Sequence, residues 1–306
     1  MQMNRFLKRC VNYRYLLIML LPCLIYVVIF NYVPMAGIVL AFKNYNYKAG
    51  IFGSPWAGWN NFRFLFLTDK IWVLTRNTLL YNLAFILVEL VMEIGVAVLM
   101  NEIGSRWFKK TFQSFMFLPH FISWVVAVAV VQVLFSFDYG LINKLLALMG
   151  MERLNISTNP DIWPPLLVML HAWKKVGYGS IVYMAAITGM DPSLYEAAAI
   201  DGANAWQRIF RITIPQLVPT AVIMFLLSAG QIFRGDFGMF YQLVGNNGVL
   251  LKTTDILDMY IYRALSGSTN LGMTAAAGLY QSVLCFVTIM MFNQVIRWIQ
   301  PDYSLF

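Results

Sequence analysis

The chain has 306 residues, of which 60% are hydrophobic and only 12% charged, and its mean hydropathy is +0.66. Soluble domains carry about 25% charged residues, so this composition excludes an ordinary soluble enzyme or binding domain. The net charge of +8 is scattered among loops and forms no basic helix. This pattern argues against nucleic acid as a partner and favours anionic membrane lipid.

Six apolar stretches are long enough to cross a bilayer as helices, because a helical span needs roughly 20 mostly apolar residues. They cover about 16–41, 78–100, 114–136, 165–188, 216–234 and 272–296. The sequence therefore predicts an all-α, polytopic membrane protein with six transmembrane helices. A short tail at 1–15 precedes a single transmembrane domain at 16–306.

The first apolar stretch is too long for a signal peptide and no small-residue cleavage site follows it, which predicts an uncleaved span. Lys and Arg are denser in the short tail and in the 101–113 loop than in the long outer loops. By the positive-inside rule, we expect both termini in the cytoplasm. Three widely spaced cysteines and two histidines predict neither a disulfide framework nor a metal site.

Two predicted spans carry charges away from their ends, and the fifth ends at Arg234. A charge costs roughly 2.5–3.5 kcal/mol near the centre of a bilayer. Glu89 and Glu93 lie in the second span, one helical turn apart, and Lys174 and Lys175 lie at a comparable depth in the fourth. We expect Glu89 or Glu93 to pair with Lys174 or Lys175. The pair either locks the packing of the two spans or leaves one lysine to line a substrate path.

The segment 189–215, between the fourth and fifth spans, is too polar to lie inside a bilayer. Asp191, followed by Pro192, can cap and start a helix, and the alanine-rich run after it favours that helix. Gly202 permits a turn with positive φ, and a second amphipathic stretch leads to Pro215. The segment is either a helical knob that fits a groove on a partner or an ordinary linker between spans.

The residues of this segment resemble the EAA signature of MetI-like permease subunits of binding-protein-dependent ABC importers. Ile214 stands where leucine is commoner. In that family the segment is the coupling helix, which docks into a groove of the cytoplasmic ATPase. The resemblance implies that the ATPase-coupling residues are Glu196, Ala197, Ala198, Asp201, Gly202 and Pro215.

The similarity extends along nearly the whole chain towards oligo- and polysaccharide permeases of the LplB type. The segments that carry it are 31–37, 41–46, 118–124, 255–263, 278–282 and 303–306. It implies a type I ABC importer fold in a bacterial cell membrane, and import of a carbohydrate, an oligosaccharide or glycan fragment, by alternating access. The implied partners are a second homologous permease, a dimer of cytoplasmic ABC ATPases, and an extracellular or lipid-anchored solute-binding protein.

A P-loop needs a Gly-Lys pair to hold phosphates, and no such dipeptide occurs in this sequence. We therefore expect that the chain is not an enzyme and binds no cofactor, and that a separate ATPase subunit uses ATP and Mg²⁺.

A sugar path needs aromatic faces with planar polar groups around them. The residues that offer these properties are Trp173, Lys174, Lys175 and Tyr178 in the fourth span, and Arg234 and Asp236 at the end of the fifth. The alternative for the second set is an interfacial cluster whose charged ends reach water.

Two other functions stay open on the residues alone. An ion-coupled secondary transporter would use the intramembrane Glu and Lys as a relay, but it would not need the EAA segment. A membrane-embedded transferase acting on lipid-linked sugar would need a cluster of catalytic acids, for which Asp255 and Asp258 are the candidates.

Overall fold

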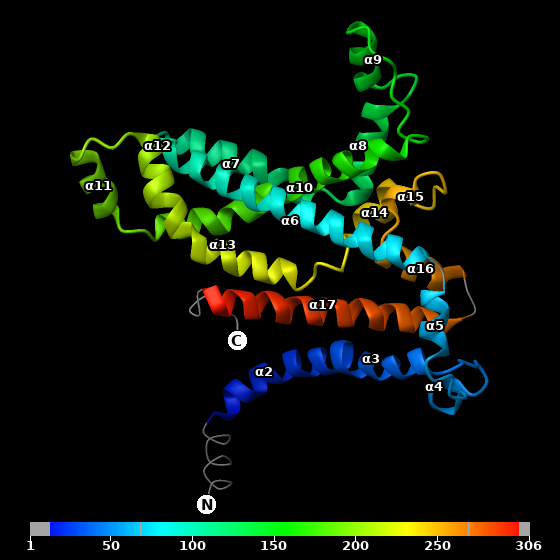
Figure 1. The fold of residues 1–306 in the computed structure, drawn as a ribbon. Coiled ribbons are helices and arrows are strands. Elements are labelled where there is room, and N and C mark those ends of the chain that lie inside the picture. Colours follow the sequence, from blue (N-terminus) through cyan, green and yellow to red (C-terminus); the bar gives the residue numbers. More distant parts are fainter. Residues whose placement is uncertain (1–12, 68, 268–269, 300–306) are drawn as a thin grey trace, which may run out of the picture. The chain divides into compact units, whose positions relative to one another are not determined.

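The computed structural model describes residues 13–67, 69–267 and 270–299, and most of them are helical. An isolated β-bridge between Lys43 and Trp56 is the only extended pairing among these residues, so the all-α prediction is confirmed. Figure 1 shows how the helical elements follow one another along the chain. Of the shorter elements, η1 and η4 are π-helices, whereas η2 and η3 are 3-10 helices. In chain order they are α2 Arg14–Val27, η1 Val28–Tyr32, α3 Val33–Met35, η2 Ala36–Phe42, α4 Gly50–Gly53, α5 Asn60–Phe66, α6 Lys70–Glu102, α7 Arg106–Phe121, α8 Trp124–Phe135, α9 Leu141–Leu148, η3 Pro160–Ile162, α10 Trp163–Thr188, α11 Pro192–Ile200, α12 Ala205–Arg208, η4 Ile209–Thr213, α13 Ile214–Ala229, α14 Phe237–Leu243, α15 Leu251–Thr254, α16 Leu257–Gly267 and α17 Leu271–Ile299.

Four helical runs among the described residues are long and apolar enough to cross a membrane. They are Arg14–Phe42, Lys70–Glu102, Ala205–Ala229 and Leu271–Trp298. A fifth is added if α7 and α8, which meet at an angle of 99°, count as one broken span. α10 corresponds to the fourth predicted span, but its lysines and histidine lower its apolar character, so the count of six stays a prediction.

The third predicted span, 114–136, is not one straight helix. α7 ends at Phe121, and Ser123 starts α8 by accepting a hydrogen bond from the Val126 N–H at 3.4 Å. Pro119 lies in the last turn of α7 and lacks a donor, which weakens the helix just before the bend.

The fifth span also differs from its predicted bounds. The helical run begins at Ala205, passes through Pro215 and Pro219, and ends at Ala229, so the two prolines lie within it. The π-turn η4 widens the helix where the ring of Pro215 would press on the carbonyl four residues earlier. Arg234, predicted as the end of this span, follows the helix in a turn.

Two compact units make up the chain: residues 1–68 with 264–280, and residues 69–263 with 281–306. In the first unit, the side-chain amide of Asn61 donates hydrogen bonds to the carbonyls of Ala41 and Lys43 at 2.9 and 3.0 Å. Lys43 Nζ in turn donates to the Phe52 carbonyl at 2.5 Å. These hydrogen bonds fix the position of the backbone at the end of η2.

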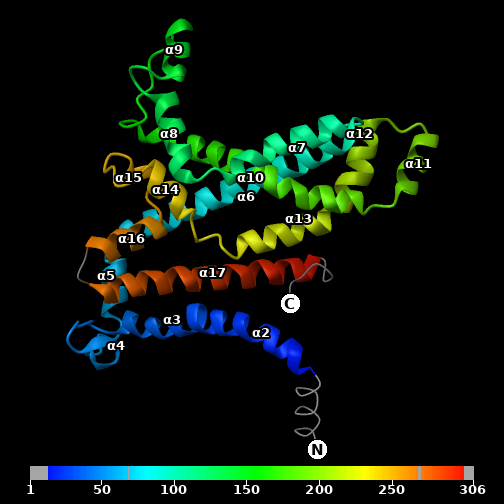
Figure 2. The same ribbon diagram turned by 180° about the vertical axis from the view of Figure 1, so that it is seen from behind.

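In the second unit, α10 packs along α6 and also contacts α7 and α13 (Figure 2). Two glycines allow the helices to approach closely. A Cβ atom at Gly177 would lie 1.8 Å from the Met116 carbonyl oxygen of α7, and one at Gly179 would lie 1.7 Å from Glu93 Oε1 of α6. Any larger residue at either position would have to push a neighbouring helix or side chain away.

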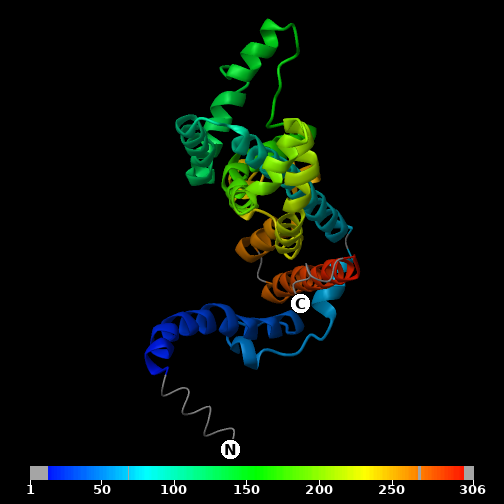
Figure 3. The ribbon, with the colours of Figure 1, turned by 90° about the vertical axis from the view of Figure 1, so that its left-hand side faces the viewer.

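One end of α6 carries a cap formed by α14, α15 and α16. Tyr81 donates to the Thr253 carbonyl at 3.0 Å, Asn77 donates to the Asp255 carbonyl at 3.1 Å, and the Leu257 N–H donates to Thr78 Oγ1 at 3.0 Å. α8 and α9 extend away from the α6–α10 pair, as the green helices in Figure 3 show. The other end of α10 leads to α11.

Candidate functional site

The segment between α10 and α13 begins with a well-formed short helix. Asp191 caps α11 by accepting a hydrogen bond from the Ser193 N–H at 2.9 Å, and this bond holds the pKa of Asp191 below its ordinary value. At the other end, the Ala203 N–H bonds the Ala198 carbonyl at 2.9 Å across Gly202, whose φ is +75°. This is the arrangement in which a glycine ends a helix, and it confirms the positive φ predicted at Gly202.

The return from α11 to the fifth span has a defined helix start. Asn204 and Gln207 form a reciprocal capping box, with bonds of 2.9 and 2.8 Å, that starts α12. Trp206 and Phe210 follow, with their rings stacked 6.0 Å apart and both exposed. Figures 1 and 2 both show α11 standing clear of α10 and α13.

The residues predicted to couple to an ATPase lie on this segment and are accessible. Glu196, Ala197, Asp201, Gly202 and Pro215 are exposed, and Ala198 is half-buried. The sequence placed Trp206, which is 67% exposed, in the second amphipathic stretch but did not indicate the apolar tip of the segment at Ile200, which is 87% exposed. The signal in the sequence was their position, because both large apolar residues lie within 189–215, a segment too polar to lie inside a bilayer.

The second group of predicted residues lies along α10. His171, Lys174, Lys175 and Tyr178 follow one another at i, i+3, i+4 and i+7, the spacing of one face of a helix. Sequence reasoning considered His171 only as a metal ligand and did not include it in this polar stripe. The i, i+3, i+4 spacing could have shown that His171 shares a helix face with the two lysines.

His171 joins two carboxylates from different elements. Its Nδ1 atom lies 2.5 Å from Glu89 Oε1 on α6, and its Nε2 atom lies 3.7 Å from Asp236 Oδ2. The imidazole also stacks on Phe85 with the ring centroids 4.1 Å apart. Asp236 caps α14 by accepting from the Met239 N–H at 3.0 Å, so this contact connects α6, α10 and α14.

Lys174 serves the bend between α7 and α8. Its Nζ donates to the His120 carbonyl at 3.1 Å, to the Pro119 carbonyl at 3.4 Å and to the Ile122 carbonyl. Carbonyls at the end of a helix lack intrahelical donors. The ammonium group supplies a donor to the His120 and Ile122 carbonyls and a second one to Pro119, which also accepts from the Ile122 N–H at 3.2 Å. The same Nζ lies 5.3 Å from the ring centroid of Trp124.

The predicted ion pair between spans two and four is not formed. Among the described residues, neither Glu89 nor Glu93 lies within 4.0 Å of a lysine Nζ. The physical reason is competition, because His171 takes Glu89 and the carbonyls at the bend take Lys174. Glu93 and Lys175 instead line a small cavity of about 130 Å³, together with Tyr178.

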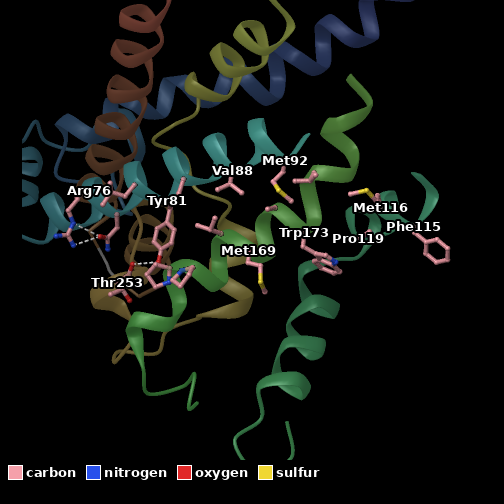
Figure 4. Close-up of a pocket in the computed structure, with 18 residues that line it drawn as sticks. Arg76, Tyr81, Val88, Met92, Phe115, Met116, Pro119, Met169, Trp173 and Thr253 are labelled. Atoms are coloured by element: carbon pink, nitrogen blue, oxygen red, sulfur yellow. Dashed lines mark hydrogen bonds between the residues drawn. The ribbon is translucent and has the colours of Figure 1, made fainter. Parts of the chain in front are cut away.

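The predicted path residues do not converge on one site. Trp173 lines an apolar groove of about 1110 Å³ on the far side of α10 from the charged stripe, beside Met92, Phe115 and Met169 (Figure 4). Consecutive residues of a helix point about 100° apart, so Trp173, Lys174 and Lys175 cannot share a site.

The turn after α13 is held from two other elements. Gln281 donates to the Phe233 carbonyl at 2.7 Å and to Asp258 Oδ2 at 3.0 Å, and Asp258 Oδ2 also accepts from the Gly235 N–H at 2.7 Å. Phe233 is buried, whereas Arg234 is exposed. The Asp258 carboxylate, considered above for catalysis, therefore holds this turn.

Comparisons with known proteins agree with one another. A family model described as "Binding-protein-dependent transport system inner membrane component" matches residues 90–301. The chain is 34% identical over 294 residues to the Polygalacturonan/rhamnogalacturonan transport system permease protein YteP of Bacillus subtilis, covering 96% of this chain and 91% of that protein. It is 32% identical to Protein LplB of the same organism, covering 93% and 89%.

A solved structure is similar over almost the full length. It is a crystal structure of a bacterial alginate ABC transporter in complex with alginate pentasaccharide-bound periplasmic protein. One chain of that structure has a TM-score of 0.87 and 33% identity to this chain, covering 96% of this chain and 98% of that one.

Proposed function

Because the chain belongs to the family of binding-protein-dependent transport system inner membrane components, we propose that it is a permease subunit through which an ATP-driven importer moves a carbohydrate into the cell. The family places the chain in the cytoplasmic membrane as a multi-pass protein. Its membership in an ABC importer family leaves no role for an ion-coupled secondary transporter.

The observation that carries the carbohydrate is the similarity to permeases with polysaccharide transport in their names, over more than nine-tenths of this chain. Polygalacturonan and alginate are both chains of uronic acid sugars. We therefore take uronate-containing oligosaccharides as the first substrates to test. A solute-binding protein outside the membrane would deliver them, and a second, related permease would complete the path.

The ATPase contact belongs to the segment 189–215 in this proposal. Its support is the exposure of Glu196 and Asp201 together with the apolar tip at Ile200. An exposed knob with an apolar tip and acidic flanks is suited to a groove with basic edges on a separate subunit. This contact puts the segment, and with it both termini, on the cytoplasmic side.

The substrate path follows the charged stripe of α10 in this proposal. Lys175 and Tyr178 line the small cavity beside Glu93, and Tyr178 is 52% exposed, so its ring can meet a sugar face. Lys174 and Asp236 hold the neighbouring bend and cap in shape, and Arg234 is an exposed cation that could meet a carboxylate. Trp173 faces the apolar groove and is left out of the path.

The test is to purify the chain with the permease, ATPase and binding protein of its own organism. ATP hydrolysis by the complex in liposomes is then measured with oligogalacturonates, alginate pentasaccharide and neutral maltooligosaccharides. We expect the ATPase to co-purify and the uronate oligosaccharides to stimulate it. Stimulation by the neutral sugars alone would contradict the substrate class, and absence of any bound ATPase would contradict the function.

Two variants test the ATPase contact within this experiment. Glu196→Lys reverses a charge on the knob, and Gly202→Pro cannot adopt the positive φ, so both should reduce stimulated hydrolysis and uptake. Glu152→Lys is the matched control, since Glu152 is also exposed but lies on the opposite predicted side of the membrane. Wild-type behaviour of both variants would remove the proposed role of this segment.

A further inference from the structure

We infer that the hydrogen bond between the hydroxyls of Tyr195 and Thr213 makes α11 move together with α13, and that Tyr195 is therefore a positioning residue for transport. The two oxygens lie 2.9 Å apart. The inference rests on the proposed function, because it supposes that α11 is the element on which the ATPase acts.

The first observation is the isolation of α11. The helix has nine residues, none of them buried, and it stands clear of α10 and α13 in both views (Figures 1 and 2). It is joined to the spans by two short connections, 189–191 and 201–204, that are not part of any helix. A helix held in this way can swing about its connections unless something ties it to the spans.

Tyr195 supplies that tie. It is half-buried, and its hydroxyl contacts both Thr213 Oγ1 and, at 3.3 Å, the sulfur of Met190. Among the described residues, no other side-chain hydrogen bond joins α11 to the span that follows it. Sulfur is a weak acceptor, so the bond to Thr213 is the stronger of the two contacts.

The partner of Tyr195 belongs to the rigid part of the bundle. Thr213 is 2% exposed and is the last residue of the π-turn η4. Ile209 and Leu217, one turn before and one turn after it, are buried in an apolar cluster with Tyr183 of α10. A displacement of Tyr195 is therefore passed to residues that are packed against two spans.

Loss of this bond should leave α11 folded but loosely connected. Its cap at Asp191 and its end at Gly202 do not depend on Tyr195. Removing one hydrogen bond changes a two-state population by about threefold to tenfold. We expect transport per ATP hydrolysed to fall by that factor, while ATPase binding is retained.

The experiment compares Tyr195→Phe, Thr213→Val and the double variant in the assembled importer complex in liposomes. Two readouts are taken: uptake of alginate pentasaccharide or oligogalacturonate per ATP hydrolysed, and the change in hydrogen exchange of α11 and α13 on trapping with ATP and vanadate. We expect both single variants to lose uptake per ATP and to lose the exchange change in α13 but not in α11. The double variant should be no worse than either single one, because both remove the same bond.

Three matched variants should behave as wild type. Thr213→Ser keeps the hydroxyl, and Met190→Leu removes only the sulfur contact. Thr188→Val removes a hydroxyl that bonds within its own helix, to the Met184 carbonyl at 2.5 Å.

The outcomes separate the two proposals. If trapping with ATP and vanadate still changes the hydrogen exchange of α13 in the Tyr195→Phe variant, the inference is wrong although the proposed function stands. The same conclusion follows if the effects of the two single variants add. If the wild-type chain retains no ATPase, the proposed function fails and the inference fails with it.

Discussion

The imidazole of His171 stands between two carboxylates, with Nδ1 2.5 Å from Glu89 and Nε2 3.7 Å from Asp236. The ring contacts both acids, and Asp236 Oδ2 also accepts a hydrogen bond from the Trp124 indole N–H at 3.0 Å. His171 is therefore the residue that allows α6 and the start of α14 to pack against the same part of α10.

We predict that His171→Phe lowers the thermal stability of the protein in detergent. Removing the imidazole takes this partner away from the partly buried Glu89 carboxylate, and leaving a buried polar group unsatisfied costs about 1–3 kcal/mol. Adding Glu89→Gln should restore part of the loss by replacing the carboxylate with a neutral amide. His120→Phe is the control, since His120 stacks on Tyr178 but pairs with no carboxylate among the described residues. Equal melting temperatures for the two histidine variants would refute the bridging role.

We predict that Lys174→Met opens the bend between α7 and α8. The carbonyls of Pro119, His120 and Ile122 then lose their shared donor, and those of His120 and Ile122, which lack the second donor that Pro119 has in the Ile122 N–H, become open to water. Hydrogen–deuterium exchange of the peptide that spans 117–128 should become faster. Lys175→Met should leave this peptide unchanged, because in the described part of the chain Lys175 donates no hydrogen bond to the bend. A Lys174 variant with the exchange of the wild type would show that the bend holds itself.

We predict that Gly177→Ala destabilises the protein more than Gly179→Ala does. The new Cβ at 177 would meet the backbone carbonyl of Met116, which cannot move without shifting α7, whereas at 179 it would meet a flexible glutamate side chain. Overpacking costs about 1–3 kcal/mol when neighbours are rigid. Gly189→Ala is the control, because its nearest neighbour would be 3.5 Å away. Thermal unfolding in detergent measures all three, and the reverse order at 177 and 179 would contradict the prediction.

We predict that Gly202→Ala loosens the segment after α11 and that Gly202→Asn does so less. The space around Gly202 is open, so the only cost is the positive φ, about 1–2 kcal/mol for an alanine and less for an asparagine. Trypsin should then cleave faster at Arg208. Gly104→Ala, also in open space but without a positive φ, should be cleaved as the wild type is. Equal rates for Gly202→Ala and wild type would contradict a role for this turn.

Local rules predicted the parts of the fold that depend on neighbouring residues. The helix start at Asp191 and the left-handed Gly202 are examples, because a cap and a glycine act within a few residues of the chain. Hydropathy located the apolar helices, but it could not find the bend at Ile122. That bend depends on a donor from Lys174, about fifty residues later in the sequence.

The predicted site was harder because partners were assigned by charge alone. Lysine and glutamate were the obvious pair, yet Glu89 pairs with a histidine and Lys174 bonds backbone carbonyls. Which groups meet is decided by how α6, α7 and α10 are rotated about their axes, and the sequence gives no direct measure of that rotation. The π-turn before Pro215 was not predicted for a similar reason. It adds one residue to a helical turn, and the composition of the helix does not reveal it.

The bend between α7 and α8 has a consequence for how the protein is made. At 1.5 Å per residue, the 16 residues of α7 and the 12 of α8 are about 24 and 18 Å long, so neither half can cross a layer of about 30 Å alone. During synthesis the two halves emerge before α10 exists, so the carbonyls at the bend lack the donor that Lys174 later supplies. Insertion of this bent helix pair is therefore completed only after α10 has been synthesised, so the order of synthesis affects how the membrane domain assembles.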